Sequence, residues 1–309
     1  MTVNLPQNEI LKLREKFYDA TVTDVIAVQP ALWIFRIKPD VERPPYMPGQ
    51  YTTIGLGFWE KCIEGNAPEI LKPGEEKKLL RRAYSISHAV VKPDGKLYKE
   101  GECDFFEFYV ALVLVGGETP TPPRLTPRLF SLKKGDRLSL GPKVTGHYHL
   151  KKPYAGNQYF FFSTGTGEAP HNAMVWQLLS GGFQGPIVNC VCTRYRIDQA
   201  YRIIHEKLAK EHPNYKVIYL ATREKDEPKL YCQDLIEQGL FEKKTGYGFN
   251  SSNTHVYLCG NPSMIGRPEV VDGKKVNPTP KGIIEILESR GFTIHTPTQS
   301  GNIHFEAYW

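Results

Sequence analysis

Four short motifs in this chain combine glycines, aromatic rings, a guanidinium and a thiol in an order that suits ligand chemistry. Their sequences are RAYS at 82–85, GTGEAP at 165–170, CGNPSM at 259–264 and EAYW at 306–309. Cations and aromatic planes can hold a flavin, and a glycine-rich turn before a helix accommodates a pyrophosphate. Each motif is weak alone, but their order indicates a flavin site followed by a nicotinamide dinucleotide site and an aromatic tail.

The first motif lies in a segment that we expect to be a strand. Alternation along a strand places Arg82 and Tyr84 on one face, and Ala83 and Ser85 on the other. A flavin requires a cation for its pyrophosphate, an aromatic plane beside its ring and a small donor near N5, and these residue types supply all three. The competing interpretation is an ordinary exposed arginine beside a half-buried tyrosine.

The second motif directly follows the apolar run 159–162 and precedes a segment of helical character. Glycines at 165 and 167 would let the backbone approach a pyrophosphate, and a helix N-terminus presents unpaired amides and the positive end of its dipole. Pro170 suits the first helical turn, where its missing N–H would have no partner. Thr166 and Gly167 are therefore candidate dinucleotide contacts; the alternative is a plain strand-to-helix turn.

A group of cations and hydroxyls follows the second and third strands that we expect in the C-terminal half. Together a guanidinium, an ammonium, a hydroxyl and a phenol suit a ribose 2′-phosphate, whereas an acid in that place favours NAD. Glu224 supplies an acid, but it follows an arginine and can face solvent. The group consists of Arg194, Thr222, Arg223, Lys229 and Tyr231. Each cation taken singly is equally compatible with a solvated surface charge.

The third and fourth motifs place sulfur and aromatic rings where they could meet a planar ligand. Cys259 ends an expected strand, where a thiol can lie beside a nicotinamide ring or can be a small buried hydrophobe. The residues that follow it directly are Gly260, Asn261 and Pro262. Because chain termini usually fray, the terminal Tyr308-Trp309 predicts a docked end, packed either in the core or against a planar cofactor.

The composition is that of a globular chain of about two domains. The 309 residues are 40% hydrophobic and 23% charged, and the longest apolar stretch, 105–117, is much shorter than the roughly 20 residues that span a bilayer. The N-terminus lacks a secretory pattern, so we expect a cytoplasmic protein. The net charge of +6 suits an anionic cofactor and an acidic partner, while the mixing of acids with bases argues against nucleic-acid binding.

Metal and nucleophile sites have little support in the sequence. The six cysteines form no CxxC pair, which argues against an iron–sulfur cluster or a structural zinc and predicts reduced thiols. His147 and His149 would share a strand face without an accompanying carboxylate, so we expect no metal. No GxSxG nucleophile pattern occurs.

The two halves of the chain differ in their apolar pattern. Short β-forming runs separated by turn signals predict an antiparallel barrel in the first half, and strands alternating with helices predict a parallel sheet covered on both faces in the second. The first half has expected strands at 17–28, 31–38, 50–56, 83–90, 105–115 and 137–140, and a helix at 127–132. The second has strands at 158–163, 187–192, 216–221 and 255–259, and helices at 168–179, 198–211, 231–238 and 281–290.

We therefore expect an N-terminal extension at 1–16, an FAD-binding barrel domain at 17–153 and an NADP-binding α/β domain at 154–309. The boundary falls near 151–157, where Pro, Gly and Asn gather. Two segments, 58–79 and 92–103, are rich in Gly, Pro, Lys and Glu. They are either solvated surface loops or segments that cover a cofactor or dock a partner.

From about Tyr18 to Trp309 the chain resembles the ferredoxin–NADP⁺ reductase family, and more closely its bacterial branch of ferredoxin or flavodoxin reductases. HVYLCGNPSM at 255–264 and the terminal Glu-x-Tyr-Trp carry most of the resemblance. It implies an N-terminal antiparallel β-barrel for FAD and a C-terminal Rossmann-like α/β domain for NADP. The chain departs from the family pattern at Pro123, where Gly is usual, and at Glu168, where an apolar residue is usual.

The resemblance also implies roles for individual residues. The implied FAD contacts are Arg82, Ala83, Tyr84, Ser85, Tyr109, Arg124, Leu125, Thr126, Thr166, Tyr308 and Trp309. The implied NADP contacts are Thr166, Gly167, Arg194, Thr222, Arg223, Lys229, Tyr231, Gly260, Asn261 and Pro262. The implied catalytic residues are Ser85, Cys259, Glu306 and Tyr308. Tyr308 would cover the flavin and move aside for nicotinamide, Cys259 would set the hydride distance, and Glu306 would handle a proton.

The activity implied by the resemblance is exchange of a hydride between NADP(H) and FAD, and of single electrons with ferredoxin or flavodoxin. One alternative is an NADH-dependent flavin reductase of the cytochrome b5 reductase or oxygenase-reductase type, against which the cations around Arg223 argue. Another is a regulatory module that keeps the fold without activity, against which the retained candidate catalytic residues argue.

Overall fold

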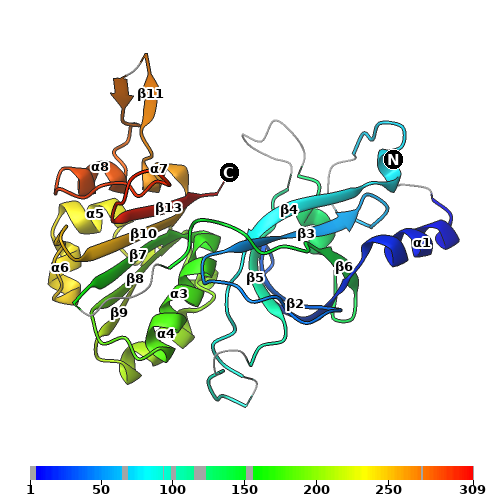
Figure 1. Ribbon diagram of the computed structural model, residues 1–309, viewed down its shortest axis with the longest axis horizontal. Coiled ribbons are helices and arrows are strands. Elements are labelled where there is room, and N and C mark those ends of the chain that lie inside the picture. Colours follow the sequence, from blue (N-terminus) through cyan, green and yellow to red (C-terminus); the bar gives the residue numbers. More distant parts are fainter. Residues whose placement is uncertain are drawn as a thin grey trace. The chain divides into compact units, whose positions relative to one another are not determined.

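The chain forms two compact units in the computed structural model, which describes residues 5–64, 69–92, 94–98, 102–114, 123–150, 156–272 and 274–308. Residues 1–89 and 101–147 form the first unit, here called the barrel unit. Residues 90–100 and 148–309 form the second, the α/β unit. Figure 1 traces the elements of both. The cofactor-binding domains proposed at 17–153 and 154–309 stay a prediction, and most of the expected boundary at 151–157 lies outside the described residues.

The barrel unit is built on a six-stranded antiparallel sheet in the order β4-β3-β6-β1-β2-β5. Its elements are α1 (Gln7–Phe17), β1 (Ala20–Gln29), β2 (Leu32–Pro39), β3 (Tyr51–Gly57), η1 (Glu75–Lys77), β4 (Leu79–Ser85), β5 (Phe106–Ala111), α2 (Thr126–Leu129) and β6 (Arg137–Leu140). Just beyond β4, the Ser87 N–H donates to the carbonyl of Glu107 in β5 at 2.8 Å. This bridge joins the two end strands, which confirms the predicted antiparallel barrel.

Three features of the barrel unit differ from the sequence prediction. Helix α1, expected only as an extension, packs Ile10 and Leu13 partly against the barrel core. Strand β4 begins at Leu79 rather than at 83, because Leu80 pairs with Leu56 of β3 and both join that core. The expectation of a wholly solvated loop at 58–79 is wrong at Phe58, which is buried in the same core.

The α/β unit contains a five-stranded parallel sheet in the order β13-β10-β7-β8-β9. Its elements are β7 (Gln158–Thr164), η2 (Gly165–Gly167), α3 (Glu168–Ser180), β8 (Ile187–Thr193), η3 (Arg196–Asp198), α4 (Arg202–Glu211), β9 (Tyr215–Ala221), α5 (Cys232–Glu237), α6 (Leu240–Thr245), β10 (Thr254–Gly260), α7 (Pro262–Ile265), β11 (Glu269–Val271), β12 (Lys274–Val276), α8 (Ile283–Glu288) and β13 (Ile303–Ala307). The chain runs outward from β7 to β9 and then returns to β10 beside β7. That reversal is a topological switch point, where open parallel sheets bind ligands.

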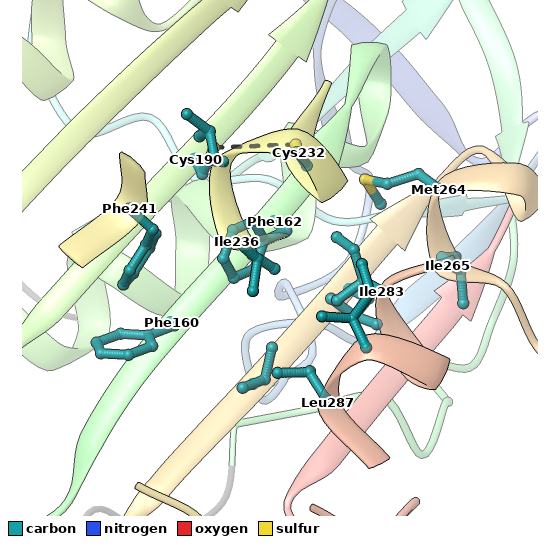
Figure 2. Packing of buried hydrophobic residues seen from close by; sticks show 14 of the residues in the cluster. Phe160, Phe162, Cys190, Cys232, Ile236, Phe241, Met264, Ile265, Ile283 and Leu287 are labelled. Carbon is teal, nitrogen blue, oxygen red and sulfur yellow. Dashed lines mark hydrogen bonds between the residues drawn. The ribbon is translucent and has the colours of Figure 1, made fainter. Parts of the chain in front are cut away.

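Both faces of this sheet are buried, as the residues of β7 show. Phe160 and Phe162 join a cluster with α5, α6, α7 and α8, here called the apolar cluster (Figure 2). Tyr159 and Phe161 join a cluster with α3 and α4, here called the mixed cluster. A parallel strand covered on both faces reads as a continuous apolar run, and this arrangement confirms the predicted α/β architecture.

Several elements of the α/β unit were not predicted. Strand β13 pairs in parallel with β10, from Val256–Ile303 to Gly260–Ala307, so the tail leads out of an edge strand of the sheet. Helices α6 and α7 and the hairpin β11–β12 are further additions. Among the described residues, no helix is both long and apolar enough to cross a membrane.

Candidate functional site

The turn after β7 lies directly against the end of β10 at the switch point. A Cβ atom on Gly167 would lie 2.4 Å from the carbonyl oxygen of Cys259. A Cβ atom on Gly260 would lie 2.3 Å from Oγ1 of Thr164, and Gly260 has a φ of +120°, which side-chain-bearing residues rarely adopt. Close backbone contact therefore requires both glycines, and it brings the second and third sequence motifs together.

The side chain of Thr164 links these two strand ends. Its Oγ1 accepts a hydrogen bond from the N–H of Asn261 at 2.7 Å. Asn261 in turn caps α7 by accepting from the N–H of Ser263 at 2.8 Å, and Pro262 occupies the first turn of that helix. Sequence reasoning missed Thr164, whose only signal was a hydroxyl at the last position of an apolar strand.

Helix α3 begins at the same turn. No described side chain caps its first amides, and Thr166 in the preceding turn is 9% exposed. The Glu168 N–H that opens the helix donates to the carbonyls of Gly165 and Thr166, so it is the positive end of the dipole of this 13-residue helix that suits an anion. Thr166 and Gly167 thus lie where a dinucleotide pyrophosphate would fit.

Cys259, Glu306 and Tyr308 come together at the carboxyl end of β10. Cys259 pairs with Glu306 across the β10–β13 ladder, and the Tyr308 N–H donates to the carbonyl of Gly260 at 2.9 Å. Burial raises the pKa of the Cys259 thiol well above its usual value, and the nearby Glu306 adds to this, while a hydrogen bond with Tyr308 opposes it. The thiol is therefore protonated at neutral pH and serves as a small buried contact rather than as a nucleophile.

Two further residues that the sequence analysis did not identify lie near this group. The hydroxyl of Tyr148 and Nε2 of His171 are hydrogen-bonded at 2.6 Å, and both side chains are buried. Tyr148 also lies close enough to Cys259, Glu306 and Tyr308 to interact with them electrostatically. Tyr148 carried no sequence signal, because it precedes the first strand of the α/β unit. Trp309, which the sequence predicted to contact FAD, lies outside the described residues.

The ends of β8 and β9 lie side by side. The Thr222 N–H donates to the carbonyl of Thr193 at 3.0 Å, and the Arg223 N–H donates to the carbonyl of Arg194 at 2.9 Å. This pairing brings the backbones of Arg194 and Arg223 together on the carboxyl edge of the sheet. Both side chains are exposed.

The remaining two members of this group come after β9. Nζ of Lys229 lies 5.5 Å from the ring centroid of Tyr231, and the tyrosine is 44% exposed. In the part of the chain that the structure describes, no ion pair involves Arg194, Arg223 or Lys229. These three cations are therefore available to an anionic ligand, which is the state that binding of a phosphate requires.

Glu224 does not face solvent freely, as one interpretation of the sequence had it. Its Oε1 accepts a hydrogen bond from the Arg196 N–H at 2.7 Å. The Arg196 guanidinium is paired with Asp226 at 2.7 Å and with Glu227 at 2.6 Å. Glu224, the acid that could contact the ribose of NAD, is thus bound to the protein backbone. The charge of Arg196, a residue that the sequence analysis did not identify, is neutralised by its two acidic partners.

The RAYS motif forms the end of β4 in the barrel unit. The β3–β4 register pairs Ile54 with Arg82. The side chains of Arg82 and Tyr84 therefore lie on the same face of the sheet as that of Ile54, which is buried in the core. Arg82 and Ala83 are exposed, Tyr84 is half-buried and Ser85 is buried. Burial raises the pKa of Tyr84, so its phenol stays protonated. The strand presents an accessible guanidinium, a ring and a hydroxyl in succession.

The other residues of the barrel unit that we predicted to contact FAD are buried or have partners within the protein. Leu125 is buried in the barrel core, and Tyr109 is buried on β5. The Thr126 hydroxyl accepts from the Val113 N–H at 3.2 Å and lies 3.3 Å from the Val113 carbonyl. The Arg124 side chain is 34% exposed. Its guanidinium also lies 3.9 Å from the Glu75 carboxylate.

Comparison with known proteins gives matches to both halves of the chain. The family model of the oxidoreductase NAD-binding domain matches residues 161–268. The chain is 27% identical over 235 residues to the flavodoxin/ferredoxin–NADP reductase of Buchnera aphidicola subsp. Schizaphis graminum, covering 75% of this chain and 81% of the relative. It is 30% identical over 211 residues to the ferredoxin–NADP reductase of Pseudomonas aeruginosa, covering 64% of this chain and 75% of the relative.

A solved structure shows the same fold. The crystal structure of a ferredoxin NADP⁺ reductase from Neisseria gonorrhoeae, with bound FAD and NADP, superposes with a TM-score of 0.67. The match covers 94% of this chain and 97% of the other, at 18% sequence identity. At this identity the similarity supports the fold alone.

Proposed function

The chain belongs to the ferredoxin/flavodoxin–NADP reductase family, and on that premise we propose that it exchanges a hydride between NADP(H) and FAD and single electrons with ferredoxin or flavodoxin. The observation that carries the proposal is the switch point. Gly167 and Gly260 bring a pyrophosphate-type helix N-terminus against the strand end that holds Cys259, with Tyr308 hydrogen-bonded to that thiol. A dinucleotide lying across this edge would bring its nicotinamide to Cys259 and Tyr308.

The barrel unit would hold the flavin. Bound FAD would supply the exchange between the two-electron chemistry of nicotinamide and the one-electron chemistry of ferredoxin. We assign Arg82 to its pyrophosphate, because this guanidinium is exposed and has no ion pair among the described residues. We assign Tyr84 to a ring face and Ser85 to a hydrogen bond near N5.

The α/β unit would hold NADP(H). Arg194, Arg223 and Lys229 supply unpaired positive charge at the carboxyl edge, and Tyr231 supplies a half-exposed ring beside Lys229. Arginines favour a phosphate through paired N–H donors. We therefore assign this group to the 2′-phosphate and the adenine.

Tyr308 would act as a displaceable cover. Its ring packs partly against the mixed cluster and its hydroxyl bonds the Cys259 thiol, so nicotinamide can approach the thiol only when the ring moves. Glu306 lies opposite Cys259 on the neighbouring strand and is the carboxylate placed to give or take a proton there. Because nicotinamide must replace the Tyr308 ring beside the thiol, displacement of this ring is one step of each turnover.

The direct experiment is spectroscopic. We expect the purified protein to show a flavin spectrum that NADPH bleaches without oxygen, and we expect ferredoxin or flavodoxin to restore it. Tyr308→Ser should bind NADP⁺ about tenfold more tightly and turn over more slowly, because the competing ring is gone. If both NADP⁺ affinity and dye reduction by NADPH are unchanged in this variant, the gating role is wrong.

The competing assignment is an NADH-dependent flavin reductase. Arg223 distinguishes the two cofactors, because only NADP carries a 2′-phosphate for it to bind. We expect wild-type kcat/KM to favour NADPH, and Arg223→Ala to reduce kcat/KM for NADPH by about 10- to 100-fold, the loss of one charge-assisted contact. NADH turnover should hardly change, and a wild-type preference for NADH would support the competing assignment.

A further inference from the structure

Strand β9 forms one edge of the parallel sheet of the α/β unit. It pairs with β8 on one side, and no strand in the described part of the chain pairs with its other side. Figure 1 shows β9 at this edge of the sheet. An unpaired edge presents a row of backbone N–H and C=O groups that can accept another strand.

A groove of about 560 Å³ runs along this edge. Its floor is the strand itself, residues 215–219, and one wall is formed by α4 through Glu206, Ala209 and Lys210. The opposite wall is formed by α6 through Lys244 and Thr245.

The two walls belong to opposite helical layers of the unit. Leu208 of α4 packs in the mixed cluster, whereas Phe241 of α6 packs in the apolar cluster on the other face of the sheet. The groove is therefore a slot between the layers, in line with the sheet. One more strand, at the usual spacing of about 4.8 Å from β9, would occupy that position.

Positive charge lines the slot. Lys210, Lys216 and Lys244 all border it, and none of them forms an ion pair with a described residue. The acid in the slot, Glu206, is already paired with Arg202 at 2.7 Å. Lysines at a sheet edge discourage pairing with another strand through their charge, and acidic side chains on the incoming strand would offset that charge.

We propose that an extended acidic segment of a partner protein binds in this slot as a sixth strand of the sheet. Its backbone would pair with β9, and its acidic side chains would meet Lys210, Lys216 and Lys244. Addition of a strand to an exposed edge is an established mode of peptide recognition, with backbone bonds giving affinity and side chains giving specificity. The slot is a separate feature from the cofactor residues, so the proposal does not depend on the oxidoreductase function.

The test uses the full chain and a fluorescent, end-blocked peptide of alternating glutamate and valine, seven residues long. We expect saturable binding by anisotropy, and slower amide hydrogen exchange in residues 216–221 when the peptide is present. Lys216→Glu should weaken binding at least tenfold, because it places a like charge at the floor of the slot. Lys207→Glu is the matched control, since Lys207 lies on α4 outside the slot and pairs with Glu211 at 4.0 Å.

A second peptide keeps every glutamate but carries N-methyl groups on all of its internal amides, which removes the N–H donors along both of its edges. Equal binding of both peptides would show charge attraction alone and would overturn the proposal, as would no binding up to about 1 mM. Self-association that protects β9 without peptide would assign the slot to a second copy and would also overturn it. If Lys216→Glu fails to fold, Lys244→Glu on the opposite wall carries the same expectation.

Discussion

On one face of the parallel sheet, α5, α6, α7 and α8 cover the apolar cluster, made of phenylalanine, isoleucine, leucine, valine, cysteine and methionine side chains (Figure 2). Its cysteines Cys190 and Cys232, whose sulfurs lie 3.9 Å apart, are thiols in an apolar setting. On the other face, α3 and α4 cover the mixed cluster together with buried ionisable groups. Glu168, His171 and His205 all lie there without exposed surface.

The ionisable groups of the second face are held in their neutral forms. Burial raises the pKa of Glu168 to about 8, against a hydrogen bond that it accepts from Tyr219 at 2.9 Å. Burial lowers the pKa of His205 to about 3, with its Nδ1 hydrogen-bonded to the Tyr215 hydroxyl at 2.7 Å. Between pH 4 and pH 8 the contribution of the apolar cluster to the free energy of unfolding should therefore stay constant, because its buried thiols remain protonated, whereas the contributions of Glu168 and His205 should change with pH.

The largest effect should come from the apolar face. The ring of Phe241 lies 4.8 Å from that of Phe160 and 4.7 Å from that of Phe249. Phe241→Ala should lower the free energy of unfolding by about 3–5 kcal/mol, because it leaves a cavity. Urea unfolding should give the same loss at pH 5 and pH 9. Ile203→Ala, at an exposed isoleucine of α4, is the control and should change stability by less than about 0.5 kcal/mol.

Glu168→Gln should stabilise the protein at high pH. A raised folded-state pKa gives stability that is complete below the unfolded value of 4.5 and is lost as pH rises toward about 8. Glutamine keeps the acceptor for Tyr219 but cannot ionise, so we expect a gain of about 5 kcal/mol at pH 9 and almost none at pH 4.

The measurement is denaturant unfolding of both proteins across that pH range. Glu211→Gln, at an exposed residue of α4, serves as the matched control. Parallel pH profiles for wild type and Glu168→Gln would show that the buried carboxyl is not held neutral, and the contrast between the two faces would fail.

His205→Gln should flatten the acid side of the profile. A lowered folded-state pKa gives stability that is complete above the unfolded value of 6.5 and is lost as pH falls toward about 3. Between pH 8 and pH 5 the variant should lose about 2 kcal/mol less than wild type. The control is His212→Gln at a partly exposed residue just after α4, and an unchanged slope in the His205 variant would contradict the prediction.

The smallest effect on stability should come from the carboxyl edge, which belongs to neither face. Arg223 is exposed and makes no ion pair among the described residues, so Arg223→Ala should shift the free energy of unfolding by less than about 0.5 kcal/mol. Thermal unfolding without ligand measures this. A large loss would mean that Arg223 has a structural role, and its assignment to NADP would need revision.

Much of the α/β unit follows from local sequence. The apolar run 159–162, the glycines of the next turn and Pro170 predicted β7 and the start of α3, because strand burial and turn conformation depend on neighbouring residues. Cys259 and Gly260 were likewise predicted at a strand end, where β10 places them.

Other elements needed partners far along the chain. β13 is only five residues long and becomes a strand by pairing with β10. Among the described residues, the barrel closes through the bridge between Ser87 and Glu107. Neither β13 nor this bridge produces a periodic apolar pattern that could be recognised in a short stretch of sequence.

By itself, the sequence determined the classes of element, the order of the two units and the residue types that suit each cofactor, since apolar periodicity and glycine conformation are local properties. Only the tertiary structure decided which groups meet: Tyr219 with Glu168, Tyr148 with His171, and two helical layers around the outer edge of β9, with which no other described strand pairs. The physical reason is that burial, pKa shifts and unpaired edges arise from distances through space, which a linear chain does not specify.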